Sequence, residues 1–148
     1  MIVIKEYSAD MQEDVLRFLT DVFPESGKAF EPNGRHAAFA DAVHNFTGFW
    51  CMFDDDKLIG TAAVKKLSDT VCELKGMYLF RKYHGHGFGR RLAETAVNYA
   101  RKQGFEQMVL DTISTYENAL RLYEKLGFVP TERYNDNQKA DVFMALKL

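Results

Sequence analysis

The stretch His84-Gly85-His86-Gly87-Phe88-Gly89 decides the fold. It follows an apolar run that ends at Phe80 and precedes a helical pattern that begins at Arg90, so it joins a strand to a helix. Its closely spaced glycines leave the backbone without side chains and permit the dihedral angles of a tight turn. The next N–H groups lie in the first turn of a helix, at the positive end of its dipole. The stretch therefore predicts an anion-binding site.

Two familiar nucleotide-binding motifs do not fit this stretch. The dinucleotide fingerprint needs another glycine three residues after Gly87, a position that Arg90 occupies. A phosphate-binding P-loop needs the three residues Gly-Lys-Ser or Gly-Lys-Thr, and neither triplet occurs. A glycine-rich turn without a ligand is a further alternative, although closely spaced glycines cost backbone entropy that a plain turn does not require.

Length and composition indicate one globular domain over residues 1–148. The chain has 148 residues, 47% of them hydrophobic, which suffices for a single core. Its net charge is −2 and its basic residues are scattered, so no nucleic-acid partner is expected. The sequence shows no signal-peptide pattern and no stretch of membrane-spanning length, which predicts a cytoplasmic protein without a membrane partner. Cys51 and Cys72 lie in apolar runs and are expected to be buried thiols.

Hydrophobic periodicity predicts the order β-α-α-β-β-β-α-β-α-β-β. Helices are expected over 9–23, 35–45 and 90–103, and a further helix between Ser114 and Gly127. Strands are expected over 2–7, 46–53, 58–67, 71–80, 105–113, 128–133 and 141–148. The crossover from 71 to 113 requires a parallel pair, whereas the hairpins require antiparallel ones. We therefore predict the α/β (α+β) class, with a mixed, mostly antiparallel sheet of seven strands and four flanking helices.

Three local signals refine the helices. Ser8 is the expected N-cap of the first helix, whose apolar face comprises Met11, Val15, Phe18, Leu19 and Val22. The weaker apolar side of the second helix comprises Ala37, Ala40 and Val43. The spacing of Ser114 and Glu117 is that of a capping box.

Two longer stretches carry a family resemblance. Leu74-Lys75-Gly76-Met77-Tyr78-Leu79 and then Tyr83-His84-Gly85-His86-Gly87-Phe88-Gly89-Arg90-Arg91-Leu92 resemble motif A of the GCN5-related N-acetyltransferase (GNAT) superfamily. Residues 117–128, Glu-Asn-Ala-Leu-Arg-Leu-Tyr-Glu-Lys-Leu-Gly-Phe, resemble its motif B. The two motifs occur in the expected order, and the predicted elements agree with the GNAT fold.

The resemblance implies that acetyl-CoA is the co-substrate and that backbone N–H groups of the glycine stretch hold its pyrophosphate. Its binding residues would be Met77, Tyr78, Leu79, His84, Gly85, His86, Gly87, Phe88, Gly89, Arg90, Asn118 and Tyr123. The motif departs from type at His84, where the family has Arg or Gln, and at Arg81, where Pro is common. Since histidine changes charge near neutral pH, binding through His84 would depend on pH.

The resemblance also suggests catalytic roles. Tyr123 would protonate the departing thiolate, and the backbone N–H of Leu79 would stabilise the oxyanion. The alternative for Tyr123 is an aromatic side chain on the core face of its helix. Period-2 alternation places Glu73 on the face of Lys75 and Met77, where a carboxylate among apolar neighbours can act as a base. Alternatively, Glu73 is an exposed strand residue or only positions the substrate.

The predicted function is transfer of the acetyl group from acetyl-CoA to a primary amine of a small molecule or peptide, in a ternary complex and without a metal. Alternatives are a non-catalytic acyl-CoA-binding sensor and a transferase that uses another acyl-CoA or a hydroxyl acceptor. The sequence does not identify the acceptor, and it leaves open whether the chain forms a homodimer.

Overall fold

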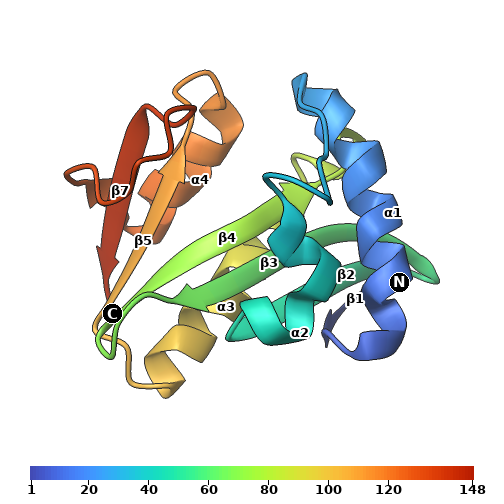
Figure 1. Ribbon diagram of the computed structural model, residues 1–148, viewed down its shortest axis with the longest axis horizontal. Coiled ribbons are helices and arrows are strands. Elements are labelled where there is room, and N and C mark those ends of the chain that lie inside the picture. Colours follow the sequence, from blue (N-terminus) through green and yellow to red (C-terminus); the bar gives the residue numbers. More distant parts are fainter.

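The strands form one sheet that mixes parallel and antiparallel pairs. In the computed structural model, which describes residues 1–148, the strands lie in the order β1-β2-β3-β4-β5-β7-β6 (Figure 1). All neighbours are antiparallel except β4 and β5. The strands are β1 (Ile2–Glu6), β2 (Gly48–Asp54), β3 (Lys57–Lys66), β4 (Val71–Leu79), β5 (Gln107–Thr112), β6 (Val129–Pro130) and β7 (Val142–Lys147). The predicted fold class is therefore confirmed.

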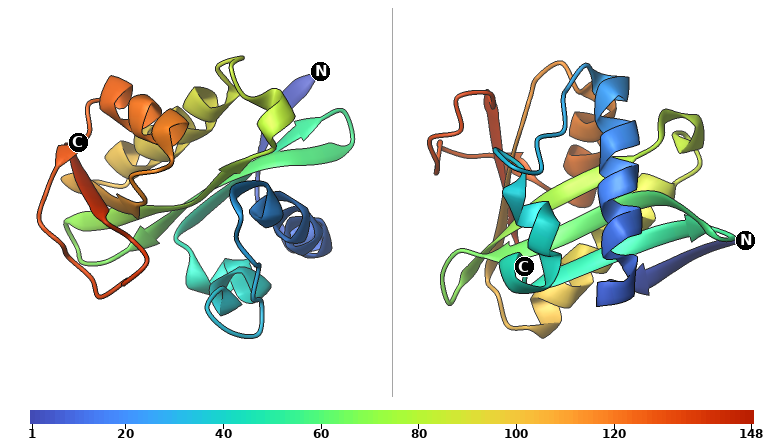
Figure 2. Two further views of the ribbon diagram at one scale, coloured as in Figure 1. Left: turned by 90° about the horizontal axis from the view of Figure 1, so that it is seen from above. Right: turned by 45° about the vertical axis from the view of Figure 1, so that its right-hand side comes forward.

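Helices cover both faces of the sheet. Helices α1 (Gln12–Val22) and α2 (Ala42–Asn45) lie on one face, and α3 (Phe88–Lys102) and α4 (Glu117–Leu126) lie on the other (Figure 2). Short 3-10 helices form the connections η1 (Ala9–Met11), η2 (Phe23–Ser26), η3 (Ala37–Asp41) and η4 (Arg81–Tyr83). Leu19 of α1, Met52 of β2 and Leu92 of α3 are fully buried in one hydrophobic core. No helix is both long and apolar enough to cross a lipid bilayer.

Several local predictions are confirmed. The apolar positions of α1 and α3 face the core, and β2 and β3 form an antiparallel hairpin. Both cysteines are free, buried thiols. Burial raises the pKa of Cys51 to about 12 and that of Cys72 to about 11, so both stay protonated at neutral pH.

Ser8 occupies the predicted N-cap position before Ala9, but its side chain caps no helix end, and the predicted capping box at Ser114 is wrong. The first helix is not continuous over 9–23: η1, α1 and η2 follow one another, and the Ser8 hydroxyl contacts the Asp10 carboxylate instead of capping a helix. Ser114 does not form a capping box either. Its N–H and hydroxyl both donate to the Asp141 carboxylate at 2.7 Å, so Tyr116 becomes the N-cap of α4. At both positions the serine hydroxyl bonds to a carboxylate, Asp10 or Asp141, and not to a free N–H at the start of a helix.

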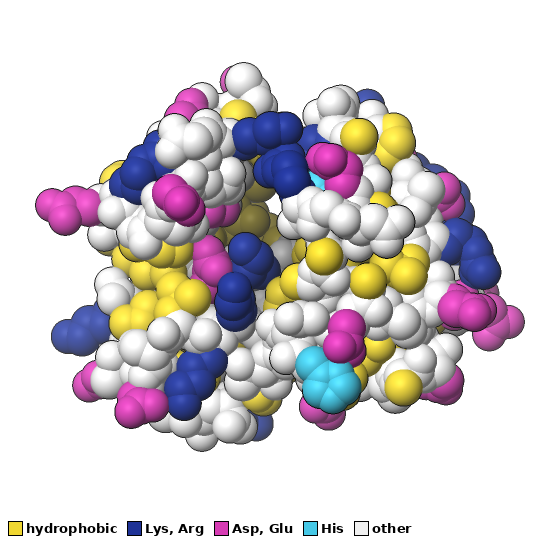
Figure 3. Space-filling view, viewed as in Figure 1, with side chains coloured by type: hydrophobic (Ala, Val, Ile, Leu, Met, Phe, Trp, Pro, Cys, Tyr) yellow, Lys and Arg dark blue, Asp and Glu magenta, His cyan; other side chains and the backbone are white.

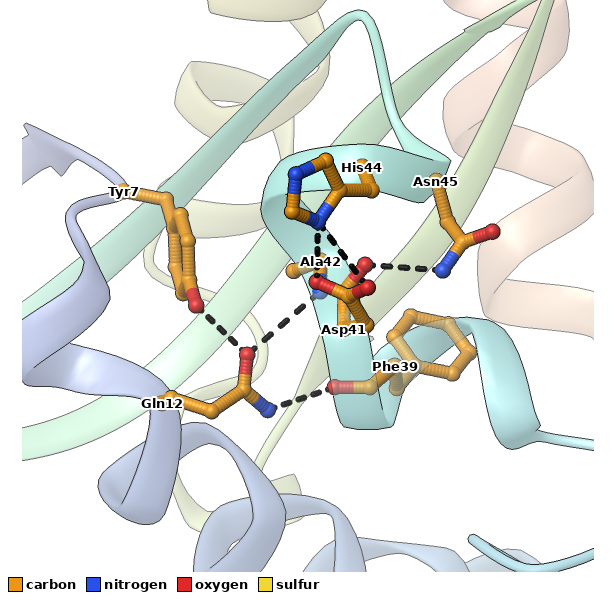
Figure 4. A network of polar contacts seen from close by, with 7 residues as sticks. All are labelled: Tyr7, Gln12, Phe39, Asp41, Ala42, His44 and Asn45. Carbon is orange, nitrogen blue, oxygen red and sulfur yellow. Dashed lines mark hydrogen bonds and ion pairs between the residues drawn. The ribbon is translucent and has the colours of Figure 1, made fainter.

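The segment over 35–45 also differs from its prediction. It forms η3 and the short α2, and the predicted apolar side faces solvent, with Val43 60% exposed. Phe39 and Ala42 are buried instead. Gln12 of α1 holds this segment, because its side-chain Nε2 donates to Phe39 O at 2.6 Å and its Oε1 accepts from Ala42 N–H at 3.4 Å (Figure 4). Hydrogen bonds from the distant Gln12 side chain, and not a periodic apolar face, therefore fix the position of this segment.

A bulge at Gly76 interrupts β4. Thr61 lies opposite Tyr78, but Ala63 lies opposite Lys75, so β4 has one residue more than β3 between these pairs. Gly76 has φ = 59°, and the Thr61 hydroxyl donates to its carbonyl at 2.6 Å. A Cβ on Gly76 would lie 2.9 Å from the Phe39 ring. Only glycine fits both the dihedral angle and the space.

The bulge changes which side chains of β4 share a face. Lys65, Ala63 and Thr61 are every second residue of β3, so their side chains lie on one face of the sheet. Their partners on β4, which are Glu73, Lys75 and Tyr78, have their side chains on that same face. The prediction that Met77 shares a face with Glu73 is therefore wrong. The Met77 side chain lies instead near Gly89 of α3, 3.9 Å from the position of a Cβ on that glycine.

Gly76→Ala should destabilise the fold by about 2–5 kcal/mol, because it combines an unfavourable positive φ with a clash against Phe39. Urea denaturation measures the difference. Gly104→Ala is the matched control, since Gly104 also has a positive φ (88°) but a Cβ there meets nothing within 4 Å. Its expected cost is about 1–2 kcal/mol. Equal costs for the two variants would refute the packing constraint at Gly76.

Candidate active site

The sheet opens between its two parallel strands. Strands β4 and β5 pair only where Val71–Glu73 meets Gln107–Val109, and then they diverge (Figure 1). The molecular surface is hollowed between the α1 and α2 side and the β5 and β7 side, with apolar atoms inside the hollow (Figure 3). The second half of β4 therefore presents an edge without a strand partner.

The backbone of Leu79 points into this opening. Phe80 N–H donates to Ile59 O at 3.1 Å, so Leu79 and Gly60 form the adjacent pair that makes no ladder bonds. The N–H and C=O of Leu79 then face away from β3. The C=O accepts a hydrogen bond from His84 Nε2 at 3.0 Å, which leaves the N–H directed toward the space between the strands.

The glycine loop, residues 84–89, joins β4 and η4 to α3. Gly85 and Gly87 have φ values of 82° and 80°, as a tight turn into a helix requires. The N–H groups of residues 85–90 donate to no acceptor in the protein, and the first bond of the helix runs from Arg91 N–H to Gly87 O at 3.1 Å. Free N–H donors at the positive end of α3 are the groups that an anion site requires, and anion binding at this loop stays a prediction.

Two contacts hold the approach to this loop. The Tyr83 hydroxyl donates to Asp54 Oδ2 at 2.7 Å, and Arg81 N–H donates to Glu25 Oε1 at 2.8 Å. Arg81 thus takes the place where the family pattern has Pro and ties the loop to η2.

The His86 ring is exposed and lies 5.7 Å from the Phe88 ring. No group of His, Cys, Asp and Glu side chains is arranged to hold a metal ion.

Arg90 and Asn118 are exposed and paired with neighbours on their own helices. Arg90 Nε donates to Glu94 Oε1 at 2.6 Å, and Asn118 Oδ1 accepts from Arg121 at 2.5 Å. A surface pocket of about 300 Å³ lies between α3 and α4, and its lining includes Arg90, Arg101 and Lys125. A ligand that uses Arg90 or Asn118 has to displace a local hydrogen bond.

Tyr123 is buried at 6% exposure and packs against Phe128. The Tyr123 hydroxyl has no hydrogen-bond partner in the protein. Every fully buried side-chain oxygen or nitrogen of the chain has such a partner, so this hydroxyl is not fully buried. The hydroxyl therefore keeps some exposure to solvent. Burial, and secondly the negative charge of Asp111, raise the pKa of Tyr123 well above its ordinary value. Burial also raises the pKa of Tyr78, with nearby Tyr123 as the next cause.

Glu73 is buried, with 4% of its surface exposed. Its carboxylate accepts a hydrogen bond of 2.5 Å from the Tyr134 hydroxyl, and Lys75 Nζ lies 3.6 Å from its Oε1. The interpretation of Glu73 as an exposed strand residue is therefore wrong. Burial, followed by the hydrogen bond to Glu73, raises the pKa of Tyr134 and keeps its hydroxyl protonated.

The loop over 131–141 supplies this partner, and sequence reasoning missed it. The loop begins early because β6 covers only Val129–Pro130 instead of the predicted 128–133. Asn135 and Asn137 fix the loop by donating to Asp111 Oδ2 at 2.7 and 3.3 Å. Tyr134 also lines a surface pocket of about 340 Å³ with Leu67, Val71 and Val109, at the end of β4 opposite to the glycine loop. No spacing rule joins Tyr134 to Glu73, which lies 61 residues away.

The fold is a mixed α/β sheet that opens beside a loop with free N–H donors. A family model described as the acetyltransferase (GNAT) family matches residues 11–128, and the chain belongs to that family.

Two relatives show the extent of the similarity. The chain is 32% identical to human N-acetyltransferase 8B over 88 residues, which cover 56% of this chain and 39% of that protein. It is 31% identical over 104 residues to the uncharacterized N-acetyltransferase YsnE of Bacillus subtilis, with 68% and 69% of the two chains covered. The chain thus spans well under half the length of the human relative.

Solved structures share the fold over nearly the whole chain. A GNAT-family acetyltransferase of Staphylococcus aureus Mu50 has a TM-score of 0.89 at 18% identity and covers 99% of both chains. YncA of Salmonella typhimurium, solved with its cofactor acetyl-CoA, has a TM-score of 0.74 at 19% identity, with 99% of this chain and 94% of YncA covered.

Tyr134→Phe should cost about 1–3 kcal/mol of unfolding free energy, because the buried Glu73 carboxylate loses its hydroxyl donor. Denaturant titrations of Tyr134→Phe, Glu73→Gln and the double variant form a double-mutant cycle. We expect a coupling of at least about 0.5 kcal/mol. Additive effects of the two changes would contradict the hydrogen bond.

Proposed function

We propose that this chain is an acetyl-CoA-dependent N-acetyltransferase, which moves the acetyl group to a primary amine of a small molecule or peptide. The observation that carries the proposal is the set of free N–H groups at residues 85–90, next to the open edge of β4. Membership of the GNAT family and the names of the relatives support it. Its two free, buried thiols are compatible with a cytoplasmic location, which we also propose.

Acetyl-CoA fits this arrangement in two parts. Its pyrophosphate would accept hydrogen bonds from residues 85–90, beside His84 and His86. The pantetheine arm carries amide groups, and these can pair with the open edge of β4 over residues 77–79 as a further strand would. Arg90 and Asn118 lie at the starts of α3 and α4, where each would exchange its local hydrogen bond for one to the donor.

The acceptor must attack as a free amine. Its nitrogen lone pair forms the new C–N bond, the thioester oxygen becomes an oxyanion, and the C–S bond then breaks to release the CoA thiolate. An alkyl ammonium with a pKa of about 10.4 pays roughly 4.6 kcal/mol to lose its proton at pH 7. The N–H of Leu79, which faces the opening, would donate to the oxyanion.

Tyr123 would act on the leaving thiolate. Its raised pKa keeps the phenol protonated at neutral pH, but it also makes the phenol a weaker acid. Tyr123 therefore stabilises the developing thiolate chiefly as a hydrogen-bond donor. A proton that passes from Tyr123 to sulfur is replaced by the one that the attacking amine loses, so the protons balance.

Glu73 would take the proton from the acceptor ammonium, directly or through water. It lies on the same face of β4 as Tyr78, and Tyr134 and Lys75 fix its carboxylate. A carboxylate held by two donors is a good positioning group for an ammonium even before the proton moves.

Gly87→Ala tests the pyrophosphate site. The new Cβ meets no protein atom within 4 Å, but it occupies space beside the free N–H groups. We expect at least a tenfold loss of acetyl-CoA affinity by calorimetry, with a stability cost equal to that of Gly104→Ala. The Gly104 variant carries the same backbone penalty away from the loop and should bind normally. Unchanged affinity in Gly87→Ala would place the pyrophosphate elsewhere.

Tyr123→Phe tests the chemistry. Its hydroxyl bonds to no protein group, so the fold should be unaffected. Turnover with an amine panel should fall about 10²–10⁴-fold while acetyl-CoA affinity stays the same. Mass spectrometry of the amine products measures turnover. If the wild-type chain binds acetyl-CoA but acetylates no amine, it is an acyl-CoA-binding module and not an enzyme.

A further inference from the structure

Lys28 places its ammonium group among three aromatic rings. Its Nζ lies 5.7 Å from the ring centre of Phe23, 5.7 Å from that of Tyr78 and 4.9 Å from that of Tyr116. The rings belong to η2, to β4 and to the N-cap of α4. We call these three rings the aromatic cage. Elements from both sides of the opened sheet therefore meet at one cation.

The backbone directs Lys28 into the cage. Gly27 ends η2 with φ = 76°, Gly27 N–H donates to Pro24 O at 3.0 Å, and Lys28 N–H donates to Phe23 O at 3.1 Å. This pair of bonds is a Schellman motif, which turns the residue after the glycine back over the preceding helix. The local sequence alone thus explains the contact of Lys28 with Phe23. It does not explain Tyr116, which comes from α4.

Attraction to ring faces is what holds this ammonium group. No carboxylate lies within ion-pair distance of Lys28, and its Nζ makes no hydrogen bond. Rings at these distances attract a cation through their negative faces, and the attraction grows as water is excluded. The walls are also fixed, because Phe23 is fully buried and lies 4.7 Å from the Tyr78 ring.

We propose that the aromatic cage binds an aliphatic ammonium group of the acceptor, and that Lys28 fills the cage until the acceptor displaces it. The inference rests on the proposed function. Tyr78 connects the cage with the reaction site, because it shares a face of β4 with Glu73 and lies near Tyr123. The Lys28 side chain marks the position and the chemistry of the group that it competes with, namely a compact cation on an alkyl arm.

The test uses tetramethylammonium, a compact cation that cannot be acetylated. Its binding is followed by NMR titration of the tyrosine ring signals. Lys28→Met keeps the length of the side chain but removes the charge, so this variant should bind tetramethylammonium at least tenfold more tightly than the wild-type chain does. Lys57→Met is the matched control, because the Lys57 ammonium lies 5.1 Å from the centre of a single ring, that of Phe80. It should behave as the wild type.

A second pair of variants tests the cage itself in the Lys28→Met background. Tyr116→Leu should abolish saturable binding, whereas Tyr116→Phe keeps the ring face and should retain it. Equal affinity in wild type and Lys28→Met, or unchanged binding after Tyr116→Leu in a folded protein, overturns the proposal.

Two competitors identify the source of the ammonium group. Cadaverine stands for a small-molecule acceptor and a lysine-containing peptide for a protein acceptor, and the one that displaces tetramethylammonium reveals the class. Displacement by neither overturns the assignment to the acceptor. Acetyl-CoA calorimetry on the same samples keeps the two proposals separate, because a chain that fails to bind acetyl-CoA loses the proposed function whatever the cage binds.

Discussion

The loss of pairing between β4 and β5 beyond Glu73 is the constraint on which the site depends. A strand can leave its ladder hydrogen bonds unmade only where other contacts support the bent backbone. Here Gly76 adopts a positive φ, the Thr61 hydroxyl satisfies its carbonyl, and Phe39 packs where a Cβ would lie. The bulge turns Tyr78 toward the face of Glu73 and leaves the N–H of Leu79 free to meet a ligand. The contacts that stabilise the bulge at Gly76 therefore also determine the shape of the site.

Charge is divided along the opened sheet. Unpaired N–H donors gather at the glycine loop, whereas the carboxylates of Glu73 and Asp111 lie on the side that the loop over 131–141 covers. Neutral donors bond to both carboxylates, Tyr134 to Glu73 and Asn135 with Asn137 to Asp111. Lys75 Nζ also lies 3.6 Å from Glu73 and offsets part of its charge, whereas the neutral donors of Asp111 leave its negative charge uncancelled. The arrangement suits a phosphate-bearing donor at one end and an ammonium-bearing acceptor at the other.

Sequence reasoning succeeded where structure follows from local pattern. The periodic faces of α1 and α3, the β2–β3 hairpin and the glycine loop could all be predicted, because neighbouring residues determine them. It failed where distant side chains decide. Gly76 is a lone glycine in a strand pattern, and only its contact with Phe39 reveals the bulge. Tyr134 reaches Glu73, Gln12 reaches Phe39 and Asp141 captures Ser114 across long separations. A single sequence that is not aligned with its relatives contains no signal for such distant pairs.

The short helix η2 links the two halves of the proposed reaction. Its Glu25 accepts the N–H of Arg81, at the entrance to the glycine loop, and its C-terminal turn directs Lys28 toward Tyr116 of the opposite side. A ligand that displaces Lys28 frees a side chain only three residues from the group that anchors the loop. The proposed acceptor cage and the proposed pyrophosphate site therefore contact the same helical turn, one through Lys28 and the other through Glu25.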